Sequence, residues 1–515
     1  MSSPFAHEWL REHARLTPDS PFLGTPSGWT SYAELLTRVE SLAGSLHGAG
    51  VGPGEVVLSS LPDGPASVAF TLAAQSLGAG VAELNREISR DSLKAVAEQT
   101  RARFAAVAAR EAGAFASLGL AKLWLVHGAE PNQRLSSLLG ATPFVRVRED
   151  GALVEPGQRH AGLPLDESST ALLVYTSGST GAPRAVVQSH RNLAANTEAI
   201  VEYLELSSRD RACLILPLFY CYGKSVLLTH LSAGASVFID HRFMYPRVVL
   251  DAMRAEGCTG FAGVPLTFEL LKRQLTDEAP TTPSLRYLTQ AGGAMHPDTI
   301  DWVRKTFAPA RLFVMYGQTE ATARLSYLPP EFAEQKRGSA GRAIRGVELR
   351  VVSEAGAPLE PGTVGNVIAS GPSITAGYFR DPAGSAEVLK DGWLWTGDLG
   401  YLDGDGFLFL TGRAKQILKL GGHRVSAQEI EEAIATHPLI AEVAVTGVAD
   451  PVAGEAAVAL VVRAADCGLS AEEIRRYSRE RLAAYKVPRD VIFVDALPRT
   501  PNGKIARGEL AKLAK

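Results

Sequence analysis

The residues best suited to chemistry lie in one loop rich in glycine and hydroxyl side chains. Residues 175–187 read Tyr-Thr-Ser-Gly-Ser-Thr-Gly-Ala-Pro-Arg-Ala-Val-Val, after an apolar run at 171–174 and before a stretch compatible with a long helix. Glycines let backbone amides approach anionic oxygens, hydroxyls donate hydrogen bonds to them, and a basic side chain balances their charge. The loop therefore suits polyphosphate, although a Ser/Gly turn without a ligand accounts for this stretch equally well.

The spacing excludes a Walker loop. The pattern Gly-x-x-x-x-Gly-Lys-Ser/Thr is absent, because the basic residue, Arg184, comes only after Gly181, Ala182 and Pro183. Four later segments follow in order and favour the phosphate interpretation. They are Tyr316-Gly-Gln-Thr-Glu-Ala-Thr322, Trp393-Leu-Trp-Thr-Gly-Asp398, the stretch 412–422 with Glu429-Ile-Glu431 after it, and Pro498-Arg-Thr-Pro-Asn-Gly-Lys-Ile505.

In this order the five segments resemble the motifs of the adenylate-forming superfamily, which includes acyl-CoA and aryl-CoA ligases, adenylation domains of peptide synthetases, and luciferases. The resemblance covers nearly the whole chain. It implies an AMP-forming acid–thiol ligase that uses ATP, Mg²⁺ and coenzyme A. Such an enzyme joins a carboxylate to the α-phosphorus of ATP, releases pyrophosphate, and then passes the acyl group to a thiol.

The resemblance also implies roles for individual residues. Lys504 matches the catalytic lysine that bridges the carboxylate, the α-phosphate and the ribose, and Thr319 matches the hydroxyl on the α-phosphate. Glu320 matches the Mg²⁺ ligand, Asp398 accepts the ribose hydroxyls, and Arg413 is a second ribose and phosphate contact. The implied ATP- and AMP-binding set is Thr176, Ser177, Gly178, Ser179, Thr180, Gly181, Arg184, Gly292, Gly293, Ala294, Tyr316, Gly317, Asp398 and Arg413.

One position departs from the family pattern. The family usually has lysine and glycine after the proline of the loop, where this chain has Arg184 and Ala185. Arginine keeps the positive charge and adds a bidentate fork, so we expect function to survive, although the two side chains are not equivalent.

For the thiol-transfer step, relatives rotate a small C-terminal domain. Lys415, two residues after Arg413, is the implied hinge. Gly421 and Gly422 admit the pantetheine arm, and Lys419 matches a basic position on that face. The implied domains are an N-terminal adenylation domain at 1–413, with a β-rich subdomain at about 341–411, and a mobile lid at 414–515.

The acid pocket implied by the resemblance is rich in aromatic residues. Its residues are Phe219, Tyr220, Tyr222, Phe261, Gly263, Gly293 and Gly317. The segment 217–223 has no carboxylate to pair with an α-ammonium group, which disfavours amino acids as substrates. The rings could clasp a flat acid such as benzoate or anthranilate, or they could be ordinary core residues.

Three alternatives therefore remain open at this point. A medium-chain fatty acid is the alternative substrate, and a separate carrier protein is the alternative to free CoA as acceptor. A non-catalytic nucleotide-binding relative is the remote alternative, disfavoured because Glu320, Asp398, Arg413 and Lys504 are all present.

Composition limits the other classes of function. The chain has 515 residues, 46% of them hydrophobic, and a formal net charge of −3 without a long basic stripe, which does not suggest nucleic-acid binding. The N-terminus lacks a signal-peptide pattern and no apolar run is long enough for a membrane span. Cys213, Cys221, Cys258 and Cys467 show no Cys-x-x-Cys spacing, as expected of buried thiols in a reducing compartment. We expect a cytoplasmic monomer or homodimer.

The motifs need an α/β scaffold to position them. Short apolar runs alternate with helical stretches and predict parallel strands at 56–61, 104–107, 123–126, 213–218, 236–240, 260–263, 287–289 and 312–314. Several of these strands end at a motif, where open α/β sheets bind ligands. Shorter strands with turn signals follow at 347–352, 365–369 and 407–410. A final α+β unit has predicted helices at 427–436 and 470–482 and strands at 443–446 and 456–462.

Overall fold

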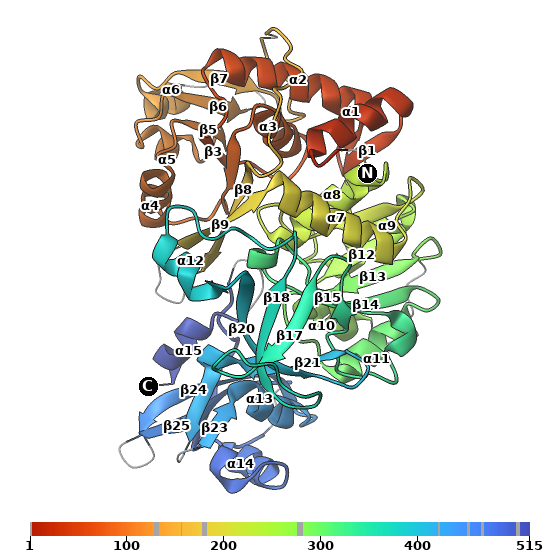
Figure 1. The fold of residues 1–515 in the computed structure, drawn as a ribbon, viewed down its shortest axis with the longest axis vertical. Coiled ribbons are helices and arrows are strands. Elements are labelled where there is room, and N and C mark those ends of the chain that lie inside the picture. Colours follow the sequence, from red (N-terminus) through yellow and green to blue (C-terminus); the bar gives the residue numbers. More distant parts are fainter. Residues whose placement is uncertain are drawn as a thin grey trace.

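The computed structural model describes residues 3–127, 133–155, 157–177, 183–275, 282–420, 423–450, 454–464, 468–500 and 505–514. These residues form four β-sheets with helices packed against them (Figure 1). The predicted α/β class, with a large N-terminal region of parallel-rich sheets and a smaller C-terminal α+β part, is confirmed.

Two large sheets make up the N-terminal region. The first has the order β7(Phe144–Val147), β6(Lys122–Val126), β5(Phe104–Ala108), β3(Val56–Ser60), β4(Gly80–Glu83), β8(Thr170–Ser177) and β9(Pro183–Ser189). The second has the order β16(Arg342–Ala343), β15(Ser326–Leu328), β14(Arg311–Tyr316), β13(Tyr287–Gln290), β12(Gly260–Gly263), β10(Arg211–Leu214), β11(Ser236–Ile239), β1(Pro21–Thr25) and β2(Gly28–Ser31). Both are parallel through their centres. The nine-stranded sheet is antiparallel at both edges, whereas the seven-stranded sheet is antiparallel only at its β8–β9 edge.

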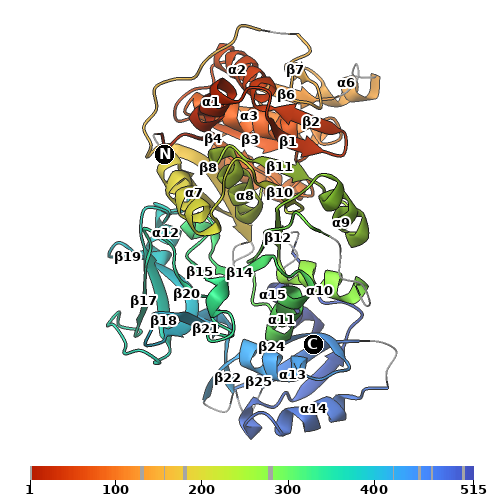
Figure 2. The same cartoon turned by 90° about the vertical axis from the view of Figure 1, so that its right-hand side faces the viewer.

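Helices cover both faces of both sheets. Between the sheets and beside them lie α1(Ala6–Leu16), α2(Tyr32–Gly48), α3(Pro65–Ser76), α7(His190–Leu204) and α8(Cys221–Ser232). The outer faces carry α4(Arg90–Thr100), α5(Ala112–Ala116) and α6(Gln133–Leu139) on one side, and α9(Pro246–Ala255), α10(Pro265–Gln274) and α11(Pro297–Thr306) on the other. Figure 2 shows α7 and α8 between the two sheets.

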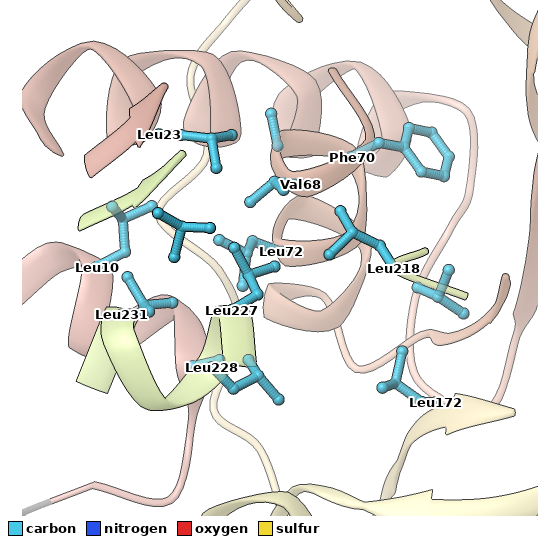
Figure 3. Packing of buried hydrophobic residues seen from close by; sticks show 14 of the residues in the cluster. Leu10, Leu23, Val68, Phe70, Leu72, Leu172, Leu218, Leu227, Leu228 and Leu231 are labelled. Carbon is cyan, nitrogen blue, oxygen red and sulfur yellow. The ribbon is translucent and has the colours of Figure 1, made fainter. Parts of the chain in front are cut away.

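Strand periodicity explains this layering. Val57 of β3 packs into the core between the sheets, whereas its neighbours Val56 and Leu58 pack under the outer helices. In the shared core, leucines of α8 such as Leu227 pack against α3 (Figure 3). The fixed position of α8 matters for the site, because the segment before it contains predicted acid-pocket residues.

Two smaller sheets complete the fold. The first is antiparallel, with β17(Glu348–Val352), β18(Gly365–Ser370), β20(Trp393–Leu402), β19(Leu389–Lys390) and β21(Leu408–Arg413), and α12(Pro382–Val388) beside it. The last comprises β23(His423–Ser426), β22(Ile417–Leu420), β25(Gly454–Arg463), β24(Ile440–Asp450) and β26(Asp490–Phe493), with α13(Ala427–Ala435), α14(Ala471–Arg479) and α15(Arg507–Leu513). In Figure 1 the first of these sheets lies beside β14 and β15 of the nine-stranded sheet, and the last lies at the bottom of the molecule.

One local prediction was wrong and one strand was not predicted. The helix-compatible stretch after residue 187 forms α7, which begins at His190, but the residues Pro183–Ser189 before it form β9, which pairs antiparallel with β8. The adjacent β-branched residues Val186 and Val187 in the middle of β9 favour a strand. The strand expected at 213–218 ends at Leu214, ahead of Pro217, which has no backbone N–H for a sheet ladder. No helix in the described part of the chain has the length and apolar character needed to cross a membrane.

Candidate active site

Three neighbouring parallel strands end at the predicted motifs. β12 ends at Gly263, β13 at Gln290 and β14 at Tyr316, and the three strands pair in register. The carboxyl ends of parallel strands share one edge of the sheet. The structure therefore brings the loop at 291–294 and the turn that starts at Gly317 side by side.

The turn after β14 contains Thr319 and Glu320 and is tightly held. The Gln188 side chain of β9 donates hydrogen bonds to the carbonyl oxygens of Thr319 and Thr322, at 3.0 and 3.1 Å. Thr322 has a φ of +64°, an uncommon value for a β-branched residue, and its hydroxyl donates to the Ser373 carbonyl at 2.7 Å. These bonds fix the direction of the Thr319 and Glu320 side chains.

The Gln188 contact was not predicted. A glutamine after two valines is a weak sequence signal for a buried contact, because a glutamine on a solvent-facing strand gives the same pattern. Gln188 is 1% exposed, and its partners lie more than 130 residues further along the chain.

Glu320 belongs to a chain of polar contacts. The Tyr378 hydroxyl donates to Glu320 Oε1 at 2.8 Å, and the Arg184 guanidinium lies over the Tyr378 ring, 5.3 Å from its centroid. Burial, and then the Glu320 charge, raise the pKa of Tyr378, so its hydroxyl stays protonated and remains a donor. Arg184 also donates to Glu387 Oε2 of α12 at 3.2 Å. Arg184, the basic residue of the predicted phosphate loop, is thus linked through Tyr378 to Glu320, the predicted metal ligand.

Backbone bonds hold Tyr378 in this position. The Val187 N–H donates to the Gly377 carbonyl and the Phe379 N–H donates to the Ala185 carbonyl, which attaches the Tyr378 segment to β9. The sequence analysis missed Tyr378. In the sequence Tyr378 is only an aromatic residue next to a glycine, and this pattern is common in loops that have no functional role.

A second cluster joins Asp398, Tyr316 and Arg413. The Tyr316 hydroxyl donates to Asp398 Oδ2 at 2.6 Å, and Arg413 Nε lies 2.7 Å from Asp398 Oδ1. Asp398 and Arg413 face each other across β20 and β21, while Tyr316 reaches them from β14. Burial and the Asp398 charge raise the pKa of Tyr316. A carboxylate has about four acceptor sites, so Asp398 can still accept bonds from a ligand.

The glycine loop after β13 is open on one side. Gln290 donates to the Gly293 carbonyl at 2.8 Å, Gly292 has a φ of +89°, and Gly293 and Ala294 are exposed. Gly317 differs, because a Cβ there would lie 2.0 Å from the Ala323 carbonyl oxygen. Only glycine therefore fits at the start of the turn after β14.

The structure brings together some of the predicted acid-pocket aromatics. The rings of Tyr220 and Tyr222 lie 6.3 Å apart in a T-shaped arrangement, and Phe219 beside them is half-buried. Cys221 Sγ lies 3.6 Å from the Thr319 hydroxyl, which places this segment against the turn after β14.

Phe261 does not join these rings. Its ring packs against Phe243 and Phe268 under the outer helices, whereas its neighbour Ala262 faces the core that contains Tyr222. Alternate residues of a strand point to opposite faces, so the Phe261 side chain lies on the other side of the sheet. Gly263, the last residue of β12, remains at the shared strand edge.

Several predicted residues lie outside the described part of the chain. These are Gly178, Ser179, Thr180 and Gly181 of the loop, Gly421 and Gly422, and Lys504. The side chains of Ser177, Lys415 and Lys419 are likewise outside the description. Thr176, which is described, pairs with Arg184 across β8 and β9.

The donor set of Glu320 suits magnesium. Mg²⁺ prefers hard oxygen ligands and is usually bound by one or two carboxylates together with substrate phosphates and waters. Glu320 Oε1 accepts from Tyr378, and Oε2 has no hydrogen-bond partner among the residues that the structure describes. A single carboxylate near a phosphate loop fits such a shared metal.

Comparisons with known proteins agree with this arrangement. The family model described as AMP-binding enzyme matches residues 10–379, and the model of the AMP-binding enzyme C-terminal domain matches residues 429–504. The chain is 33% identical to an indoleacetate–CoA ligase from Aromatoleum aromaticum, over 98% of this chain and 97% of that protein. It is 32% identical to a feruloyl-CoA synthase from an Amycolatopsis species, over 98% of both chains.

A solved structure shows the same fold. The o-succinylbenzoate coenzyme A synthetase from Bacillus subtilis, in complex with ATP and a magnesium ion, is 27% identical, with a TM-score of 0.82 over 98% of both chains. The order of the motifs, the paired clusters at the strand ends and these likenesses lead to one assignment: this chain belongs to the AMP-binding enzyme family.

Proposed function

We propose that this protein is an ATP-dependent acid–CoA ligase that activates a small aromatic acid. The observation that supports it best is the convergence of two carboxylate clusters on the turn after β14. Glu320, which accepts from Tyr378, lies in this turn. Tyr316, which ends β14 just before the turn, donates to Asp398, and Asp398 is paired with Arg413. Such a site can hold a nucleotide at both its phosphate and its ribose end.

In the proposed first step, the acid carboxylate attacks the α-phosphorus of ATP and pyrophosphate leaves. Attacker and target are both anionic, so positive charge and hydrogen-bond donors must lie between them. Lys504 and the Thr319 hydroxyl are proposed to supply these on the α-phosphate, and the residues at 176–184 to hold the β- and γ-phosphates. Glu320 would hold Mg²⁺, which would supply positive charge next to the phosphates.

Asp398 is proposed to bind the ribose. Its two oxygens are aligned by Tyr316 and Arg413, at 2.6 and 2.7 Å, so the carboxylate is already oriented before a nucleotide arrives. Preorganised groups lose little free energy to ordering when a ligand binds. Tyr316 also belongs to β14, so the same strand would position the ribose and the α-phosphate.

The second step is proposed to follow a domain rotation. The domain at 414–515 would turn about Lys415 relative to 1–413, removing Lys504 and bringing in Gly421, Gly422 and Lys419. The CoA thiol then attacks the acyl carbon, the thioester forms and AMP leaves.

The proposed acid is a benzoate- or anthranilate-like compound. The close pair of Tyr220 and Tyr222, with Phe219 beside it, favours a flat ring over a long tail. Because Phe261 lies on the opposite face of the sheet, the proposed slot has three aromatic residues rather than four. A medium-chain fatty acid is the second candidate substrate. A cytoplasmic location, a monomer or homodimer, and free CoA rather than a carrier protein complete the proposal.

The test is an acid-dependent exchange of pyrophosphate into ATP, screened over a panel of acids. We expect exchange only when an acid is present, and a higher kcat/KM for benzoate or 2-aminobenzoate than for octanoate. With CoA alone, mass spectrometry should detect the aryl thioester. Preference for octanoate would contradict the aryl assignment. An adenylate that persists with CoA but clears with a carrier protein would contradict CoA as the acceptor.

A further inference from the structure

A buried arginine lies directly behind the proposed site. Arg324 follows the turn after β14 and is 3% exposed. Its guanidinium packs on the Tyr222 ring at 4.1 Å from the ring centroid, and its Nε lies 3.2 Å from Met315 Sδ. Nη1 has a long contact, 3.4 Å, to the Ala323 carbonyl, and the Tyr203 hydroxyl, which is neutral, is a further hydrogen-bond partner of the guanidinium. Thioether sulfur is a weak acceptor, and none of these partners carries a negative charge.

No carboxylate of the described residues forms an ion pair with Arg324. The buried lysine of α8 provides a contrast, because Lys224 lies 2.6 Å from Glu83. A buried charge without a counter-charge is costly, and proteins usually pair it. An unpaired guanidinium at this position calls for a role that offsets the cost.

A small cavity lies at this arginine. It has a volume of about 20 Å³ and is lined in part by Tyr203, Thr289, Met315 and Arg324. Such a volume holds about one water-sized group. Met315 precedes Tyr316 in β14 and Thr289 precedes Gln290 in β13, so the cavity adjoins the strand ends of the proposed active site.

The other groups in the cavity do not neutralise the arginine. Burial lowers the pKa of His230 to about 4, so its ring is neutral. Its Nδ1 lies 2.8 Å from the Val226 carbonyl, which can only accept, so Nε2 must accept from Tyr287, 2.8 Å away. The Tyr222 hydroxyl donates to Thr289 Oγ1 at 2.8 Å. Among the described residues the cavity therefore offers donors and a positive charge but no anion.

We propose that Arg324 recognises a hydroxyl group on the ring of the acid, at the end away from the reacting carboxylate. The ring would lie against Tyr222, and its hydroxyl oxygen would enter the cavity and accept from the guanidinium. The volume suits one oxygen atom and excludes a second carboxylate. This inference rests on the proposed function and narrows its substrate class to hydroxylated aromatic acids.

The test compares benzoate, 3-hydroxybenzoate, 4-hydroxybenzoate and their methoxy counterparts by acid-dependent pyrophosphate exchange. In the unmodified protein we expect kcat/KM for one hydroxybenzoate to exceed that for benzoate and for the matching methoxy acid by about tenfold or more, the usual effect of one charged hydrogen bond. Activity with benzoate but no preference for either hydroxy acid would overturn the inference and leave the proposed function intact. No exchange with any acid would overturn both.

Arg324→Met supplies the second arm, because Met has a similar length and no charge. The loss in kcat/KM should be about tenfold or more for the preferred hydroxybenzoate and much smaller for benzoate, and Arg324→Lys should recover part of the preference. The matched control is Arg342→Met, which removes an exposed arginine that packs on Phe407 and does not line the cavity. An equal loss for both acids in a folded Arg324→Met protein would show a structural role and overturn the inference.

Discussion

At the residue scale, the site is built from pairs of side chains that orient each other. Asp398 has one oxygen held by Tyr316 and the other by Arg413, and Glu320 is held by Tyr378. Each carboxylate would otherwise rotate about its side-chain torsions. We therefore expect the partners to contribute to ligand binding, although we assign them no direct part in bond making.

We expect Asp398→Asn to raise the KM for ATP and to lower kcat/KM by about 10- to 100-fold, because charged hydrogen bonds to the ribose are replaced by neutral ones. The Arg413 side chain is half-exposed, so loss of its ion pair should change the melting temperature little. Steady-state kinetics at varied ATP concentration are the measurement. Tyr316→Phe, which removes one orienting hydroxyl, should show a smaller effect of the same kind. A larger loss in Tyr316→Phe than in Asp398→Asn would contradict the assignment of the ribose to Asp398.

Tyr378→Phe should weaken the apparent affinity for Mg²⁺ by about 3- to 10-fold, because Glu320 loses the hydrogen bond that orients it. A titration of adenylation rate against Mg²⁺ measures this. Tyr401→Phe is the control, since Tyr401 stacks on Phe409 at 5.0 Å and is remote from Glu320. An unchanged Mg²⁺ titration in Tyr378→Phe would argue against Glu320 as the metal ligand.

The sequence motifs identify Thr319, Glu320, Asp398 and Arg413 as candidates, because each lies in a short segment with a recognisable order of residues. They do not identify Gln188 or Tyr378. Both act on Glu320 or its turn from segments that are distant in sequence, and only folding brings them close. For Phe261 the motif gave the right strand but not the right face. A shift of one residue along a strand decides which face of the sheet a side chain occupies.

At the element scale, strand ends fix the site. Alternating apolar runs predicted β3, β5, β6, β12, β13 and β14 to within about two residues of their bounds. They did not predict that β9 returns antiparallel along β8, because the loop between them contains the usual signals of a helix start. The antiparallel return brings Gln188 to the turn after β14 and leaves Arg184 at the end of the strand next to the loop.

Gly317→Ala tests the turn after β14. A Cβ at this position would lie 2.0 Å from the Ala323 carbonyl oxygen, so the turn must shift. We expect a loss of about 1–3 kcal/mol in the free energy of unfolding, as for other overpacked sites, together with a large loss of adenylation. Thermal and urea unfolding measure the first effect.

Gly293→Ala is the matched control for this change. Its Cβ would meet Pro265 Cγ at 3.5 Å, an ordinary contact, so the unfolding free energy should stay nearly constant. Similar destabilisation in both variants would show that the tight approach at Gly317 does not determine the effect.

At the scale of the whole molecule, buried histidines make stability depend on pH. Burial lowers the pKa of His7, His190 and His230 to about 4 each, with charge repulsion from neighbours as a smaller cause at His7 and His190. The unfolded chain binds protons near pH 6.5 and the folded chain does not, so stability is complete above pH 6.5 and falls as pH drops toward 4.

Each of these histidines should contribute a slope of about 1.4 kcal/mol per pH unit between pH 6.5 and 4. Urea unfolding at several pH values should therefore show that the unfolding free energy of His230→Gln changes less steeply with pH. The decrease in slope should correspond to about one bound proton. His241→Gln is the control. Burial lowers the pKa of His241, but the hydrogen bond and charge of Asp63 outweigh this and raise it overall. Its contribution has the opposite sign, so the acid-side slope should not decrease. An unchanged slope in His230→Gln would refute a neutral buried ring.

The layered architecture connects these scales, because one core between the two large sheets fixes α8 and, through it, both the acid-pocket segment and Arg324. We propose that this scaffold positions a carboxylate for attack on the α-phosphorus of ATP. The most direct measurement uses an acid labelled with ¹⁸O in both carboxylate oxygens, with ATP and CoA, and mass spectrometry of the products. We predict that the released AMP contains one ¹⁸O atom, that the pyrophosphate contains none, and that the thioester keeps the other. Label in inorganic phosphate, or AMP without label, would contradict adenylation of the acid.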